Sequence, residues 1–193
     1  MSAPARQVPE PFRSFPSPLE RRVAKILGFL SGTVAVASVA VYLATFVPGV
    51  RLAVGDIWPL PVAAVACVTA SLLRHAWRTK RLQKRYGTTW DRARAVANVP
   101  TATGKRMELL YGAAFVFCGF NFILFAVAFH NGSPELRDGQ FVLERKGRSA
   151  RGITENEYFR LKAYELRLVA AGSLAFSLAP LLTLFRAAPE TEV

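Results

Sequence analysis

The sequence predicts a mainly α-helical protein, a four-helix transmembrane bundle with a small extracytoplasmic β-hairpin that leads into an extended fourth helix. The first reason is that 52% of the 193 residues are hydrophobic and gather in long blocks, whereas a soluble core would scatter them periodically. The second is a polar segment of hairpin character before the last block. The third is that four blocks are uncharged and long enough to cross a bilayer: Ile26 to Val50, Ile57 to Leu73, Leu109 to Phe129 and Leu168 to Phe185.

The charge distribution indicates a membrane protein and argues against nucleic-acid binding. The net charge is +12, but the basic residues lie beside the apolar blocks, where they set topology and contact anionic lipid headgroups. We therefore expect the lipid bilayer as a partner and no nucleic acid. Cys67 and Cys118 both lie inside apolar blocks, so they do not indicate a secreted disulfide framework.

The chain is expected to divide into two tails and one membrane domain. Residues 1–22 are expected to form a disordered N-terminal tail, because Met1 to Leu19 contain five prolines and little apolar content to bury. The membrane domain is expected at 23–186, followed by a short C-terminal tail at 187–193. Within the domain we expect spans at about 26–48, 57–76, 107–129 and 166–186, a cytoplasmic basic connector at 74–108 and an extracytoplasmic hairpin-helix module at 130–165.

The first span contains a candidate helix-packing face. Gly28 and Gly32 lie four residues apart on one side of the expected helix, and Ser31, Ala35 and Ser38 continue that side. Small residues allow two helix backbones to approach closely. The face serves either packing inside the chain's own bundle or contact with a second copy of the chain, and we favour packing inside the bundle.

The second span is the shortest. Only 17 residues separate Asp56 from Arg74, and at 1.5 Å per residue this length barely reaches across ~30 Å of hydrocarbon. Trp58 and Trp77 stand at its two ends, where tryptophans act as interfacial anchors.

The connector after this span predicts the orientation. Residues 74–108 hold ten of the 25 Lys and Arg residues, which places the connector in the cytoplasm by the positive-inside bias. With both termini also in the cytoplasm, 16 basic residues lie inside and nine outside. Within the connector, apolar residues between Trp90 and Ala97 recur at helical spacing, which is typical of either a short interfacial helix or an ordinary solvated helix.

The third span contains the candidate intramembrane polar contact, Asn121. It lies near the middle of the span, where an amide normally faces protein or water. It therefore marks either a hydrogen bond between helices or a substrate path. We favour the hydrogen bond, because amides commonly link helices in membranes.

The polar module after the third span contains turn and strand signals. Asn131 to Pro134 is a turn cluster, and Gln140 to Glu144 and Arg148 to Ile153 are typical of two strands joined by a turn at 145–147. A two-stranded hairpin is marginally stable alone. We therefore expect it to rest on the helix ends or on the membrane surface.

A helix is expected to begin after this hairpin and to continue into the fourth span. Thr154 and Glu157 form a candidate capping box. No Gly or Pro follows before Gly172, and Pro180 is expected to kink the second half of the span. Arg167 lies where the chain enters hydrocarbon, and its side chain is expected to extend toward the headgroups.

The segment from Gly132 to Arg167 resembles one found in small multi-pass bacterial inner-membrane proteins of unknown function. The resemblance implies a bacterial plasma (inner) membrane protein and supplies no activity and no functional residue. It covers about 36 residues and rests on these strings: Gly132-Ser-Pro-Glu135, Asp138-Gly139-Gln-Phe-Val-Leu143, Gly147, Ile153-Thr-Glu-Asn-Glu-Tyr158 and Glu165-Leu-Arg167.

No sequence motif for catalysis or cofactor binding is found. His75 and His130 are expected at opposite membrane faces, so they cannot share a metal ion. The chain has no Gly-rich phosphate loop, HExxH, GxSxG or CxxC. We therefore expect no catalytic, cofactor-binding or metal-binding residue, no cofactor, and a protein that is not an enzyme.

Two functions from different classes remain. The favoured one is a non-enzymatic membrane component that interacts with a protein or lipid partner, or with copies of itself as a homo-oligomer, through the outer module or the small-residue helix faces. The alternative is a small-molecule transporter or channel subunit that acts as an oligomer, with Asn121 and Pro180 lining or gating a path. A water-accessible cavity at the depth of Asn121 would favour the alternative.

Overall fold

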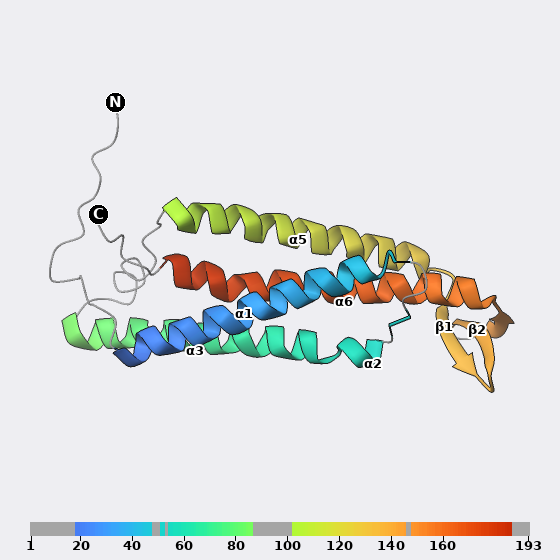
Figure 1. The fold of residues 1–193 in the computed structure, drawn as a ribbon, viewed down its shortest axis with the longest axis horizontal. Helices are drawn as coiled ribbons and strands as arrows, with labels where there is room; N and C mark the ends of the chain where they lie inside the picture. Colours follow the sequence, from blue (N-terminus) through green and yellow to red (C-terminus); the bar gives the residue numbers. More distant parts are fainter. Residues whose placement is uncertain (1–17, 48–50, 53, 87–101, 146–147, 187–193) are drawn as a thin grey trace, which may run out of the picture.

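The computed structural model describes residues 18–47, 51–52, 54–86, 102–145 and 148–186 (Figure 1). The described segments form five helices and three strands. In chain order they are α1 (Pro18–Ala44), α2 (Val54–Ile57), α3 (Pro59–Tyr86), α5 (Ala102–Ala128), β1 (Ser133–Arg137), β2 (Gln140–Arg145), β3 (Arg148–Gly152) and α6 (Glu155–Arg186).

Helices α1, α3, α5 and α6 are each long and apolar enough to cross a membrane. They run side by side, and α6 lies among the other three and packs along each of them (Figure 1). Accordingly, 44% of the apolar window of α6 is buried, against 11% of that of α5. The predicted fold class is confirmed, and the last helix of the chain is its central element.

The helix boundaries differ from the predicted ones at several places, including the start of α5, which is at Ala102 and not at 107. Helix α1 begins at Pro18, so residues 18–22 are helical and the predicted disordered tail is wrong for them. Proline suits the first helical position, where its missing amide hydrogen has no helical partner to bond. Helix α3 continues to Tyr86, ten residues beyond the expected end of its span at 76. Residues 1–17, the candidate interfacial helix near Trp90 and the tail at 187–193 lie outside the described residues.

Small side chains form the interior of the bundle. The buried residues include Ala64 and Cys67 on α3 and Ala170, Ala171 and Ala175 on α6. Buried serines in this interior donate to carbonyls of their own helices: Ser38 to Val34 at 2.7 Å, Ser173 to Val169 at 2.8 Å and Ser177 to Leu174 at 2.8 Å. The larger apolar side chains, such as those of α5, point outward, as expected of a surface that faces lipid.

The module between α5 and α6 contains a three-stranded antiparallel sheet in the order β1-β2-β3 (Figure 1). The predicted hairpin is present as β2 and β3. The sequence interpretation of Ser133 and Pro134 as part of a turn is wrong, because both belong to β1 and pair with β2. The connecting turn is Asp138-Gly139, with φ angles of 51° and 77°. Positive φ at both central residues is characteristic of the two-residue hairpin turn whose twist matches the strands.

The sheet is attached to the bundle by short connections on both sides. The amide of Gly132, before β1, donates to the carbonyl of Phe129 at the end of α5 (3.1 Å). On the other side, the Phe141 ring of β2 packs on Tyr158 of α6 with ring centroids 4.9 Å apart. Helix α6 then continues without a break to Arg186, as predicted. We call this part of the molecule the sheet end, and the opposite part, where α1 begins and α6 ends, the basic end.

Candidate binding groove at the sheet end

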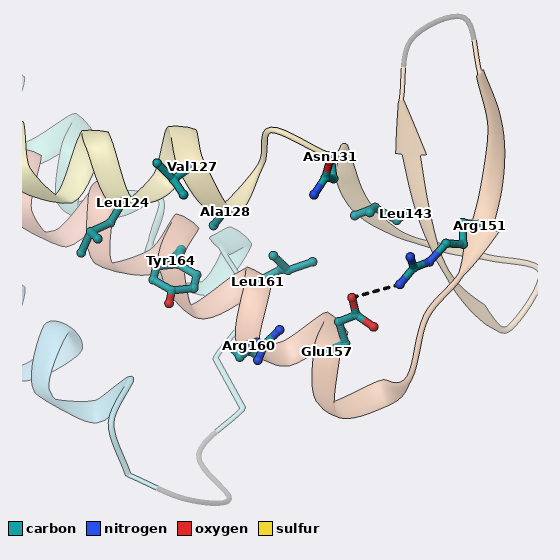
Figure 2. Close-up of a pocket in the computed structure, with 10 residues that line it drawn as sticks. All are labelled: Leu124, Val127, Ala128, Asn131, Leu143, Arg151, Glu157, Arg160, Leu161 and Tyr164. Atoms are coloured by element: carbon teal, nitrogen blue, oxygen red, sulfur yellow. Dashed lines mark ion pairs between the residues drawn. The ribbon is translucent and has the colours of Figure 1, made fainter.

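A groove of about 750 Å³ lies between the sheet, the end of α5 and the first turns of α6 (Figure 2). Consecutive elements of the chain, from the end of α5 through the sheet to the start of α6, meet there. Its lining residues are Leu124, Val127, Ala128, Asn131, Leu143, Arg151, Glu157, Arg160, Leu161 and Tyr164.

One side of the groove is apolar. Leu124, Val127 and Ala128 come from the last two turns of α5, Leu161 from α6 and Leu143 from β2 (Figure 2). The Val127 side chain is 68% exposed, so the apolar side of the groove continues onto the outward surface of α5.

The other side of the groove is charged. The Arg151 guanidinium and the Glu157 carboxylate form an ion pair with a nitrogen-oxygen distance of 3.5 Å, which links β3 to the first turn of α6 (Figure 2). Arg160 lies one turn further along α6 and is exposed, and within the described part of the chain it makes no ion pair. Asn131 adds an exposed amide. The groove therefore carries one unbalanced positive charge beside its apolar wall.

The capping residues have two separate tasks. The Glu157 amide donates to Thr154 Oγ1 at 3.2 Å, which satisfies one free donor at the start of α6 and is one of the two bonds of the predicted capping box. The Glu157 carboxylate pairs with Arg151 of the sheet. The carboxylate of Glu157 thus orients the sheet against the helix that the Thr154 hydroxyl caps.

A smaller cavity of about 240 Å³ lies against the same stretch of α6 and shares Arg160 and Tyr164 with the groove. Arg167 borders it, donating from Nε to Thr45 Oγ1 at 2.9 Å and from Nη2 to the Thr45 carbonyl at 3.3 Å. The Arg167 guanidinium also lies 3.9 Å from the Phe46 ring centroid. Sequence analysis assigned Arg167 to the headgroups, and the structure gives it protein partners at the end of α1.

Arg51 makes a second link between α6 and the segment that follows α1. Its Nη1 lies 2.7 Å from a carboxylate oxygen of Glu155, and its guanidinium lies 4.6 Å from the Phe159 ring centroid. No local sequence signal marks these partners, since more than 100 residues separate them along the chain.

Asn121 lies between α5 and α1 and is 2% exposed. Its Oδ1 accepts from the Tyr42 hydroxyl at 3.3 Å, and its Nδ2 donates to the Phe117 carbonyl one turn back at 2.9 Å. The Tyr42 ring also packs on Phe117 with ring centroids 4.9 Å apart. Asn121 is therefore part of a helix-helix contact, and neither the groove nor the smaller cavity includes it.

The glycine pair on α1 does not form the packed face of this helix. A Cβ atom built on Gly32 meets no atom within 4 Å, and Gly28 is only partly buried. Gly32 therefore does not closely approach a neighbouring helix, whereas Ser31 and Ser38 of the predicted face are buried. The buried stripe of α1 lies one position earlier along the chain than the two glycines: Leu27, Ser31, Val34 and Ser38.

The described residues contain no group of three or more His, Cys, Asp or Glu side chains that could hold a metal ion. Comparison of the chain with protein-family models, curated proteins and solved structures gives no match.

Proposed function

We propose that this protein is a non-enzymatic multi-pass membrane protein that binds a protein or lipid partner in the groove at its sheet end. The observation that carries the proposal is the combination of an apolar wall, continuous with the outward surface of α5, and a charged wall with one unbalanced arginine, Arg160. A partner that fits is amphipathic, with an apolar segment along Leu124 and Val127 and a polar or anionic group at Arg160.

We further propose a bacterial plasma (inner) membrane, with both termini in the cytoplasm. The resemblance of the segment from Gly132 to Arg167 to small bacterial inner-membrane proteins supports the proposed bacterial location. The 16 basic residues expected inside, against nine outside, support the orientation. The sheet end then faces the extracytoplasmic side.

The contacts of Asn121 support partner binding over the transporter alternative. A transport path through this helix would need a polar group at mid-depth that is available to a substrate. Instead, the Asn121 amide is bonded to Tyr42 and Phe117. Both cavities lie at the sheet end, where docking of a partner requires no passage through the bundle.

Site-specific photo-crosslinking in cells tests the proposal. A photoreactive leucine analogue at Leu143, which lines the groove, is expected to give one adduct of defined mass with a protein or a lipid. The matched control is the same analogue at Leu136, which is 59% exposed on β1 and does not line the groove. Arg160→Glu should lower the yield at Leu143 if the partner is anionic at that point. Equal adduct patterns from Leu143 and Leu136 would contradict the proposal.

A further inference from the structure

The basic end carries two arginines on the face of α3 that packs against the bundle. The buried residues Ala64, Cys67 and Ser71 are three or four residues apart along α3. Arg74 and Arg78 continue this stripe at the same spacing, and both are half-buried. Arginines at a membrane boundary usually extend toward water. These two side chains instead start from the inward face of their helix.

Glu20 is the carboxylate that faces them from α1. It continues the buried stripe of α1 toward the basic end, at helical spacing from Ser31 and Leu27. Its side chain is 20% exposed and lies 3.1 Å from Nη1 of Arg81. It also attracts the guanidinium groups of Arg74 and Arg78. Among the described residues, one carboxylate therefore stands among three guanidinium groups, which leaves an excess of two positive charges at this point.

Within the described part of the chain, the Nε donor of Arg74 also has no hydrogen-bond acceptor. This atom is shielded from solvent. A shielded donor on a charged group is costly when it is left without an acceptor. Together, the excess positive charge and the unsatisfied Nε donor of Arg74 favour the binding of an anion between α1 and α3.

We infer that Arg74 and Arg78 form a site for the phosphate group of an anionic phospholipid. A guanidinium presents paired donors that match phosphate oxygens, and such charge-assisted bonds are among the strongest that side chains make. The inference does not rest on the groove at the sheet end, because the two sites lie at opposite ends of the bundle (Figure 1).

The surroundings favour a lipid phosphate over a free one. At the same level of α3, Leu73 is 67% exposed and Trp77 is 54% exposed. Exposed leucine beside tryptophan is typical of the boundary between hydrocarbon and headgroups. The Arg81 guanidinium lies 3.9 Å from the Trp77 ring centroid and extends the basic surface outward. A phosphate at Arg74 can therefore keep its acyl chains on the apolar surface of the same helix.

Lipid binding to the full chain in mild detergent tests the site. Phosphatidylglycerol or phosphatidylcholine is added, and bound lipid is counted by native mass spectrometry. Arg74→Gln and Arg78→Gln are each expected to weaken phosphatidylglycerol binding about tenfold, as loss of a charge-assisted pair does. Lys80→Gln is the matched control, since it removes the same charge from an exposed position of α3. Its binding is expected to change by less than about twofold.

One further variant, one stability measurement and one further ligand test the assignment to a lipid phosphate. Arg74→Lys retains the charge but not the planar fork, so its binding is expected to lie between those of the parent and Arg74→Gln. Arg74→Gln is expected to unfold near the parent's temperature in phosphatidylcholine, because the lost attraction to Glu20 is offset by relief of the repulsion between Arg74 and Arg78. Equal loss in Lys80→Gln would show a nonspecific charge effect and overturn the site. Equal thermal stabilisation by inorganic phosphate at the same phosphate concentration would overturn the lipid assignment.

Discussion

At the scale of single residues, the polar groups inside the bundle serve packing. Ser38 and Ser173 each donate a hydrogen bond to a carbonyl one turn back. The Asn121 side chain donates to a carbonyl of its own helix and accepts from the Tyr42 hydroxyl. Such bonds remove the cost of placing polar atoms in an apolar interior. The serine side chains are also small, which allows α6 to lie close to its three neighbours.

The bond between Tyr42 and Asn121 is expected to be weak. Its oxygen-oxygen distance of 3.3 Å is long for a hydroxyl donor. Asn121→Leu should lower the free energy of unfolding by about 1 kcal/mol, and the coupling between Asn121→Leu and Tyr42→Phe should be about 0.5 kcal/mol. A double-mutant cycle of unfolding in mixed micelles measures both quantities. Unchanged stability in Asn121→Leu, together with loss of a cellular phenotype, would instead favour the transporter alternative.

Gly132 is expected to tolerate no side chain. Its φ is +133°, and a Cβ atom there would lie 2.6 Å from the Glu144 carbonyl oxygen. Gly132→Ala should therefore destabilise the sheet by about 2 kcal/mol or more. Gly139→Ala, at φ +77° in open space, should cost only about 1 kcal/mol. Hydrogen exchange of the β2 amides compares the two variants, and an equal effect would contradict the close approach at Gly132.

At the scale of elements, arginines join α6 to the end of α1, and their surroundings set how much each contributes. Arg167 is partly buried with two bonds to Thr45, so Arg167→Gln should lower the free energy of unfolding by about 2 kcal/mol. The Arg51 and Glu155 side chains are 62% and 47% exposed, so Arg51→Gln should cost less than about 1 kcal/mol. Chemical unfolding of the two variants measures the difference, and the reverse order would contradict these contacts.

Because α6 runs without a break from the sheet into the bundle, the two parts are expected to behave as one rigid unit. Inserting two alanines after Lys162 rotates the preceding part of α6 by about 200° relative to the rest. The contacts of Arg51 with Glu155 and Phe159 are then lost. The insertion should lower the melting temperature and abolish the crosslink at Leu143, and a Gly-Ser pair at the same place tests tethering alone. Unchanged stability and crosslinking in the alanine variant would show that the module moves independently.

Local sequence patterns predicted most of the helices, whereas strand β1 and the groove were not predicted. The four apolar blocks and the Thr154 cap predicted the helices and the start of α6, because both signals are contained in short stretches. Strand β1 was missed because Pro134 and a single apolar residue, Leu136, hide its alternation, although Asp138-Gly139 is a strong hairpin signal. The groove was not predictable at all. It depends on how the sheet lies against α5, which no periodicity encodes.

At the scale of the whole molecule, the two ends of the bundle differ in their charge. The described parts of α1 and α3 at the basic end, residues 18–25 and 74–86, carry nine Lys and Arg residues and one acidic residue, Glu20. The sheet end carries both signs, with Arg151 paired to Glu157 and Arg51 to Glu155. By the positive-inside bias, this asymmetry supports the proposed orientation, with the basic end in the cytoplasm and the groove on the extracytoplasmic side.

Cysteine labelling in intact cells tests this arrangement most directly. On a background with Cys67→Ala and Cys118→Ala, single cysteines replace two exposed glutamines, Gln140 in β2 and Gln83 in α3. A membrane-impermeant maleimide is expected to modify Gln140→Cys in intact cells and to modify Gln83→Cys only after the membrane is permeabilised. Labelling of Gln83→Cys alone in intact cells would invert the orientation, and labelling of both would contradict a bundle that crosses the membrane.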